Sequence, residues 1–227
     1  DLADLGITVD CLPVLDVPVP GAHDIIGDRA FGADPATVIA LGRAQIDGLL
    51  DGGVLPVMKH IPGHGRSRAD SHLALPRVDA SREALSASDF VTFRSLNHCP
   101  AAMTAHVVYE AIDPQRPCTT SPKVIRDVIR GEIGFEGLLM SDDLSMKALD
   151  GPLPVRARAA LFAGCDVVLH CNGDMDEMTD VAREAKTLEG LPLKRAQQAL
   201  ARLAPPPVFD AAAADARLTA LLAGAAA

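Results

Sequence analysis

The segment most informative about the fold is Val54-Leu55-Pro56-Val57-Met58, followed directly by Lys59-His60-Ile61-Pro62-Gly63-His64-Gly65. Its first five residues form a short, continuous apolar run, which is typical of a strand buried on both faces of a sheet. In the second part, a proline and a glycine disfavour a regular helix, so the lysine and the histidines are expected on a loop. A titratable loop at the end of a buried strand is where an α/β enzyme carries its chemistry.

The same order of strand, loop and helix recurs along the chain. Short apolar runs lie at 7–17, 54–58, 101–105, 137–140 and 166–169. Asp34-Pro35 and Ser121-Pro122 each place a capping side chain before a proline, which predicts that a helix begins there. Further helices are predicted at 86–96, 154–162 and 175–185. Alternating strands and helices predict a parallel sheet with right-handed crossovers.

Polar residues follow each predicted strand at its carboxyl end. They are Asp16, Lys59, His60, His106, Asp142, Asp143 and residues 170–172. This asymmetry favours an α/β fold of the (β/α)8 TIM-barrel type, in which the catalytic groups gather at the carboxyl ends of the strands. A doubly wound sheet would gather them at one switch point, often with a GxGxxG turn, which this sequence lacks.

The chain is short for a complete barrel. About five βα units fit between residues 7 and 186, whereas a barrel needs eight strands and about 250 residues. We therefore expect an incomplete barrel over residues 1–187, without its amino-terminal strands, and a helical tail over 188–227 that packs on it. An open barrel exposes apolar surface that monomers rarely tolerate, so a complementing chain or segment is expected to cover it.

Composition excludes several classes of function. The net charge of −9, with no dense cluster of lysine and arginine, argues against a nucleic-acid partner. The apolar runs are far shorter than the roughly 18 residues of a membrane span. The amino terminus lacks the pattern of a signal peptide, and the five scattered cysteines include no CxxC pair. We expect a cytoplasmic protein with reduced thiols and no cofactor or metal.

Three residues stand out as candidates for catalysis. Asp142 follows the strand predicted at 137–141, where it could act as nucleophile, base or metal ligand, or simply cap the next helix. Asp70 and His72 lie two positions apart in a loop. In an extended loop both side chains would face the same way, so that the carboxylate orients the imidazole and favours its protonated form. A salt-bridged surface histidine is the alternative.

A metal site is a further alternative. His60 and His64 have the i, i+4 spacing of two ligands on a helix, and with Asp142 they could serve a metal-dependent hydrolase. Pro62 and Gly63 lie between the two histidines and break such a helix, which argues against this hypothesis.

Four motifs in order carry a resemblance to a known family. They are PVLDV at 13–17, GDRAFG at 27–32, KHIPGHG at 59–65 with DSH at 70–72, and SDDLSM at 141–146. Together they resemble the bacterial β-N-acetylglucosaminidases of glycoside hydrolase family 3, and are most similar to the cytoplasmic enzymes of peptidoglycan recycling. The resemblance runs from about residue 5 to residue 185.

The resemblance implies a role for each matching residue. It makes Asp142 the nucleophile and His72 the acid/base, paired with Asp70. It implies that Arg29, Lys59 and His60 hold the hydroxyls of the sugar. For Arg29 and Lys59 the alternative is a structural ion pair with Asp16 or Asp28.

The resemblance also implies an activity. This is a retaining β-N-acetylhexosaminidase that releases terminal β-linked N-acetylglucosamine from muropeptides or related oligosaccharides through a covalent glycosyl-aspartate. The DQEGG-type string of the family has no match here, in keeping with the missing strands. A sugar-binding remnant without catalysis, which needs a partner chain, is the alternative.

Overall fold

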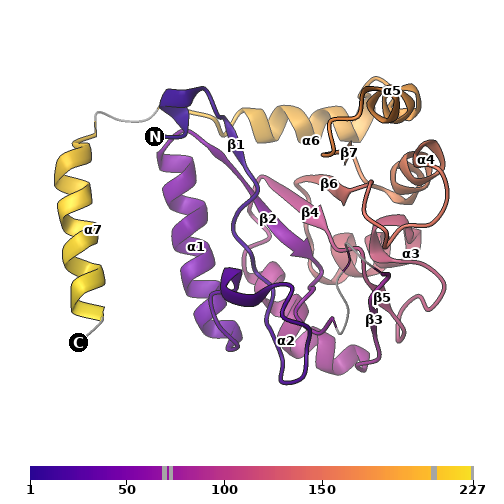
Figure 1. Ribbon diagram of the computed structural model, residues 1–227, viewed down its shortest axis with the longest axis horizontal. Coiled ribbons are helices and arrows are strands. Elements are labelled where there is room, and N and C mark those ends of the chain that lie inside the picture. The colour runs from indigo at the N-terminus through magenta and orange to yellow at the C-terminus, as the bar shows by residue number, and fades with distance from the viewer. Residues whose placement is uncertain (68–70, 72–73, 206–208, 226–227) are drawn as a thin grey trace.

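The computed structural model describes residues 1–67, 71, 74–205 and 209–225, so Asp70 and His72 lie outside the described residues. Its central feature is a sheet of five parallel strands that curls into part of a barrel (Figure 1). In sheet order the strands are β1 (Val9–Asp10), β2 (Leu55–Ile61), β4 (Ala101–Thr104), β6 (Leu138–Asp143) and β7 (Val167–Leu169). Each lies within or overlaps a predicted apolar run, and the predicted incomplete α/β barrel is confirmed.

Helices follow the strands along the chain (Figure 1). They are α1 (Pro35–Asp51), α2 (Arg82–Ser95), α3 (Pro122–Val124) with its π-helical continuation η4 (Ile125–Glu132), α4 (Leu153–Ala163) and α5 (Met175–Glu184). Single turns of 3-10 helix occur at η1 (Ala3–Leu5), η2 (Gly27–Arg29) and η3 (Cys118–Thr120). A second sheet of two short parallel strands, β3 (Arg77–Val78) and β5 (Val108–Tyr109), was not predicted.

The helix starts follow from capping side chains. Asp34 accepts a hydrogen bond from the Thr37 N–H at 3.0 Å, and Ser121 accepts one from the Val124 N–H at 3.1 Å. Both starts were predicted. The start of α2 was predicted too late, at residue 86, because Ser81 accepts a hydrogen bond from the Ala84 N–H and begins the helix at Arg82.

The alternation of side chains along the strands creates two apolar layers. Met58, Ala102 and Leu139 belong to the large core that includes residues of the helices, such as Val38 and Phe90. Val57, Ala101 and Met103 belong to a smaller cluster, against which Cys11, Leu138, Met140 and Leu169 pack while only partly buried. The helix-covered face of the sheet is therefore the better packed of the two.

Two further helices follow α5. Helix α6 (Gly190–Leu200) contacts β6, and its Arg195 pairs with the buried Asp166 at 3.0 Å, which also pairs with Arg130 at 3.0 Å. Helix α7 (Ala211–Ala225) lies beyond α1, away from the sheet, and nearly all its described side chains are exposed (Figure 1). The division of the chain at residue 187 stays a prediction. Among the described helices, none combines the length and apolar character needed to cross a membrane.

Candidate active site

The site is built around a fully buried carboxylate, that of Asp16, in the segment after β1. Its Oδ2 lies 2.7 Å from Nδ1 of His60, and its Oδ1 accepts hydrogen bonds from the backbone N–H groups of His60 at 3.3 Å and His64 at 2.6 Å. Asp16 thus orients one imidazole ring and holds the loop that follows β2.

The charge of Asp16 follows from these contacts. Burial by itself raises the pKa of this carboxyl, but the neighbouring His60, its hydrogen bond and His64 outweigh burial and lower the pKa below its usual value. Asp16 is therefore ionised, and a buried carboxylate needs the hydrogen bonds that it receives here.

Asp142 lies across from His60, close to the carboxyl end of β6. Its Oδ2 is 3.9 Å from Nε2 of His60, and its Oδ1 accepts a hydrogen bond from the backbone N–H of Asp143 at 2.8 Å. The carbonyl of Asp143 in turn lies 3.0 Å from Nε2 of the buried His106. Asp16, His60 and Asp142 therefore form a row of carboxylate, imidazole and carboxylate.

A cavity of about 150 Å³ opens at this row. Its lining is Ile25, Ile26, Arg29, Lys59, His60, His64, Ser71, Asp142 and Met146. Four residues singled out from the sequence, Arg29, Lys59, His60 and Asp142, are thus brought together. The cavity presents two cationic side chains and one carboxylate to a ligand, a combination that suits a polyhydroxylated molecule.

The loop with the other two candidates reaches the same cavity at Ser71. Ser71 is buried, lines the cavity, and accepts a hydrogen bond from the Ala148 N–H at 3.1 Å through its carbonyl. Asp70 and His72, its neighbours in the chain, lie outside the described residues.

The sequence left two alternatives open, structural ion pairs of Arg29 and Lys59 and a metal site at His60, His64 and Asp142. Neither Lys59 nor Arg29 forms an ion pair with a described residue; Arg29 instead donates a hydrogen bond to the carbonyl of Ile25 at 2.6 Å. Within the described ranges, no three histidine, cysteine or carboxylate side chains are placed to hold a metal ion. His60, His64 and Asp142 are therefore not among side chains placed to hold a metal ion.

Asp16 and His64 are two residues of the site that were not predicted as such from the sequence. A charged residue inside the apolar run Val14-Leu15-Asp16-Val17 was the available signal, because a buried carboxylate requires partners. For His64 the signal was its place in the loop, which sequence reasoning considered only as a metal ligand.

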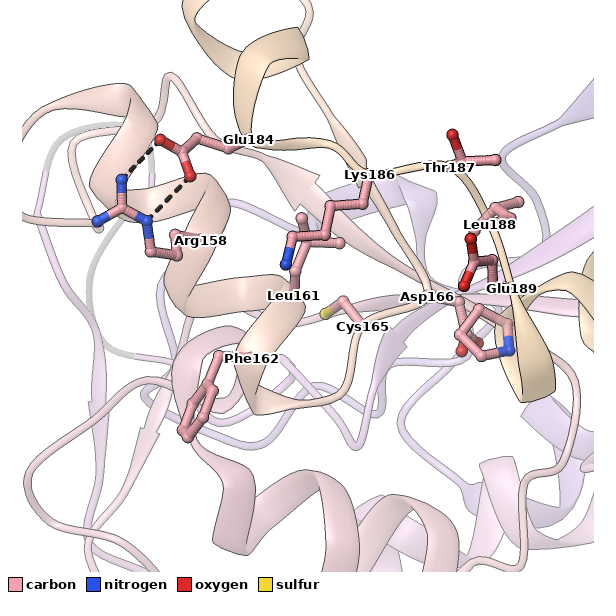
Figure 2. A pocket seen from close by; sticks show the side chains of 11 residues that line it. Arg158, Leu161, Phe162, Cys165, Asp166, Glu184, Lys186, Thr187, Leu188 and Glu189 are labelled. Carbon is pink, nitrogen blue, oxygen red and sulfur yellow. Dashed lines mark hydrogen bonds and ion pairs between the residues drawn. The ribbon is translucent and has the colours of Figure 1, made fainter.

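A second, larger hollow of about 520 Å³ lies between α4 and the segment that leads to α6 (Figure 2). At one side Arg158 and Glu184 form two hydrogen bonds, at 2.6 and 2.9 Å, which neutralise each other's charge. The exposed Phe162 and the thiol of Cys165 lie at its wall. No candidate residue from the sequence lines it, and the first cavity is the better candidate for chemistry.

Comparison with known proteins agrees with the motifs. Residues 1–205 match the family model described as the glycosyl hydrolase family 3 N-terminal domain. The chain belongs to glycosyl hydrolase family 3. The resemblance recognised in the four motifs is therefore confirmed.

Relatives within glycosyl hydrolase family 3 share both sequence and fold. A beta-hexosaminidase of Alkalilimnicola ehrlichii is 49% identical over 176 residues, which is 76% of this chain and 50% of that protein. NagZ from Neisseria gonorrhoeae, in complex with N-trifluoroacetyl-D-glucosamine, has a TM-score of 0.76 at 37% identity, over 87% of this chain and 58% of that one.

A family 3 beta-N-acetylglucosaminidase from Paenibacillus has a TM-score of 0.74 at 30% identity, over 92% of this chain and 43% of that one. The chain spans about half the length of the curated relatives it matches.

Proposed function

We propose that this protein is a retaining β-N-acetylhexosaminidase that removes terminal β-linked N-acetylglucosamine from oligosaccharides. The observation that carries the proposal is the place of Asp142, near the end of β6, 3.9 Å from His60 and in one cavity with Lys59 and Arg29. The names of the relatives, beta-hexosaminidase and beta-N-acetylglucosaminidase, support the same activity.

In the proposed reaction Asp142 attacks the anomeric carbon of the sugar. The bond from this carbon to the leaving oxygen breaks as a bond to the Asp142 carboxylate forms, and His72 gives its proton to the leaving oxygen. Water then attacks the same carbon, His72 takes a proton from it, and the carboxylate of Asp142 is released. Two displacements on one carbon retain its configuration.

An imidazole in place of the usual second carboxylate suits the second step. The attack of water on the glycosyl ester regenerates a carboxylate, and a neutral base adds no second negative charge beside it. Imidazole exchanges protons near neutral pH, with an ordinary pKa of about 6.5. Asp70, two residues before His72, is the group that we propose orients its ring.

His60, Lys59 and Arg29 are proposed to hold the sugar. Lys59 and Arg29 carry positive charge into the cavity and donate hydrogen bonds, which are stronger than those of neutral donors. His60 has one nitrogen bound to Asp16 and the other turned toward Asp142, so its ring is fixed before a sugar binds.

We further propose that the natural substrates are muropeptides, and that the protein acts in peptidoglycan recycling in the cytoplasm. The resemblance of the four motifs to the family's enzymes of peptidoglycan recycling supports this substrate class. The similarity to NagZ from Neisseria gonorrhoeae, solved with N-trifluoroacetyl-D-glucosamine, supports a glucosamine-type sugar in the cavity. A sugar-binding protein without catalysis, the alternative raised by the sequence, is not favoured by these similarities.

The test is hydrolysis of p-nitrophenyl N-acetyl-β-D-glucosaminide by the 227-residue chain, beside the variants Asp142→Ala and Asp176→Ala. Loss of the nucleophile is expected to reduce kcat by roughly 10⁴-fold or more. Asp176, exposed in the first turn of α5, is the matched control and is expected to leave the rate unchanged. A folded wild-type chain that binds the sugar without cleaving it would contradict the proposed activity and favour that alternative.

A further inference from the structure

His64 is a buried histidine of the cavity that the proposed reaction leaves without a role. Its side chain lines the same cavity as Lys59 and Asp142, and the residue is 3% exposed. Its backbone N–H donates to Asp16 at 2.6 Å, and its ring lies edge-on to that of His60, with centroids 5.6 Å apart. The position of His64 is therefore fixed through its backbone and not through its ring nitrogens.

The ring nitrogens of His64 have no hydrogen-bond partner among the described residues, and Nδ1 is fully enclosed. Buried polar atoms in folded proteins are nearly always paired. Leaving one unpaired costs the free energy of removing that atom from water. Nε2 is not enclosed in this way. It is therefore the ring nitrogen that a ligand in the cavity can reach.

The charge state of His64 limits what that partner can be. Burial, and next to it the neighbouring His60, lower the pKa of His64 to about 4, although Asp16 acts in the opposite direction. The ring is therefore neutral at neutral pH and offers one N–H donor and one acceptor nitrogen. Lys59 and Arg29 can only donate, and an ionised Asp142 can only accept.

We propose that His64 is a substrate-binding residue that forms a hydrogen bond with an uncharged hydroxyl or acetamido group of the sugar. Either group can both donate and accept, which matches a neutral imidazole, whereas an ammonium can only donate and a carboxylate only accept. The inference rests on the proposed function, because it assigns a contact to the sugar that the cavity is proposed to bind.

The test is equilibrium binding of N-acetylglucosamine and of glucose to the full chain, by calorimetry or NMR titration. His64→Phe keeps a ring of similar size but removes both nitrogens, and it is expected to weaken binding about tenfold. His64→Asn and His64→Gln place an amide near Nδ1 and Nε2, respectively, and one of the two is expected to restore affinity. His98→Phe, at an exposed histidine, is the matched control and is expected to bind as wild type does.

The two sugars separate the two possible partner groups. An equal loss for glucose and N-acetylglucosamine identifies a hydroxyl, whereas a loss confined to N-acetylglucosamine identifies the acetamido group. A folded His64→Phe chain with wild-type affinity for both sugars overturns this inference and leaves the proposed function standing. A wild-type chain that binds neither sugar overturns both.

A measurement on the wild-type chain keeps the inference testable should the variants not fold. The ring resonances of His64 are expected to shift when N-acetylglucosamine is added. Shifts at Lys59 and His60 with none at His64 would overturn the inference while supporting the proposed site.

Discussion

At Asp16 a single carboxylate holds three groups, the ring of His60 and the backbone N–H groups of His60 and His64. Asp16→Ala leaves these donors without a partner inside the protein. Because removing one member of a buried pair leaves uncompensated polar groups, the free energy of unfolding is expected to fall by about 3–5 kcal/mol. Urea denaturation measures the loss, with Asp47→Ala on the exposed face of α1 as control. Equal stability of the two variants would contradict the role given to Asp16.

His64 makes stability depend on pH in a defined window. Its pKa is about 4 in the folded protein against an ordinary value of 6.5, so an unfolded chain binds this proton more readily. The contribution of the neutral His64 ring to the free energy of unfolding is fully present above pH 6.5 and is lost as pH falls toward 4. The loss is expected to reach about 3 kcal/mol. Urea denaturation at pH 7.5 and 4.5 measures this loss of stability. In His64→Phe the part of the loss that is due to His64 is expected to be absent. Identical pH profiles of the two chains would contradict the low pKa assigned to His64.

His72 has a proposed role that depends on the leaving group. His72→Ala is expected to reduce the hydrolysis of N,N′-diacetylchitobiose by roughly 10²–10⁴-fold, because a sugar oxygen must be protonated as it leaves. The loss should be much smaller with an acidic phenol, which leaves without a proton. Rates on both substrates measure the difference, and equal losses would remove His72 from the role of acid.

At the scale of elements, the loop after β2 fits against the segment after β1 only through a glycine. A Cβ on Gly65 would lie 2.0 Å from the carbonyl oxygen of Val17, which is backbone and cannot move aside easily. Gly65→Ala is therefore expected to destabilise the protein by about 3 kcal/mol or more.

The matched control for this element is Gly48→Ala in the last turn of α1, where a Cβ would meet nothing within 4 Å. That change is expected to stabilise the protein by about 0.5 kcal/mol, since alanine suits a helix better than glycine does. Denaturation midpoints measure both variants. A Gly65→Ala chain as stable as wild type would show that the loop docks differently.

At the scale of the whole molecule, the two carboxyl-terminal helices differ in how they attach. Removing residues 206–227 takes away α7, whose described side chains are nearly all exposed, and is expected to change the stability by about 0.5 kcal/mol at most. Removing residues 188–227 also takes away Arg195, one of the two partners of the buried Asp166. This longer truncation is expected to cost about 3 kcal/mol or more.

Thermal and urea denaturation of the two truncated chains measures this difference. Equal losses would mean that α6 adds nothing to the barrel. A large loss from removal of α7 alone would mean that α7 packs on the rest of the protein more closely than its exposure indicates.

Much of this architecture could be predicted because its signals are local. Apolar runs of strand length and the caps Asp34 and Ser121 depend only on neighbouring residues, so the five strands of the main sheet and the starts of two helices follow from them. The short pair β3 and β5 could not be predicted in this way. Each strand has two residues, and their pairing depends on how distant loops meet.

The family, the repeated βα pattern and the candidates Asp142, Lys59, His60 and Arg29 could all be identified from the sequence. Each depends on a motif or on a strand end, and both are visible in a short run of neighbouring residues. The contacts of Asp16 with His60 and His64, which are 44 and 48 positions away, became visible only in the folded chain. The same holds for the His64 ring, which has no hydrogen-bond partner beside the cavity within the described part of the chain. The physical reason is that hydrogen-bond partners and burial depend on which distant segments meet. Parallel strands bring such segments together through crossovers whose path no local pattern encodes.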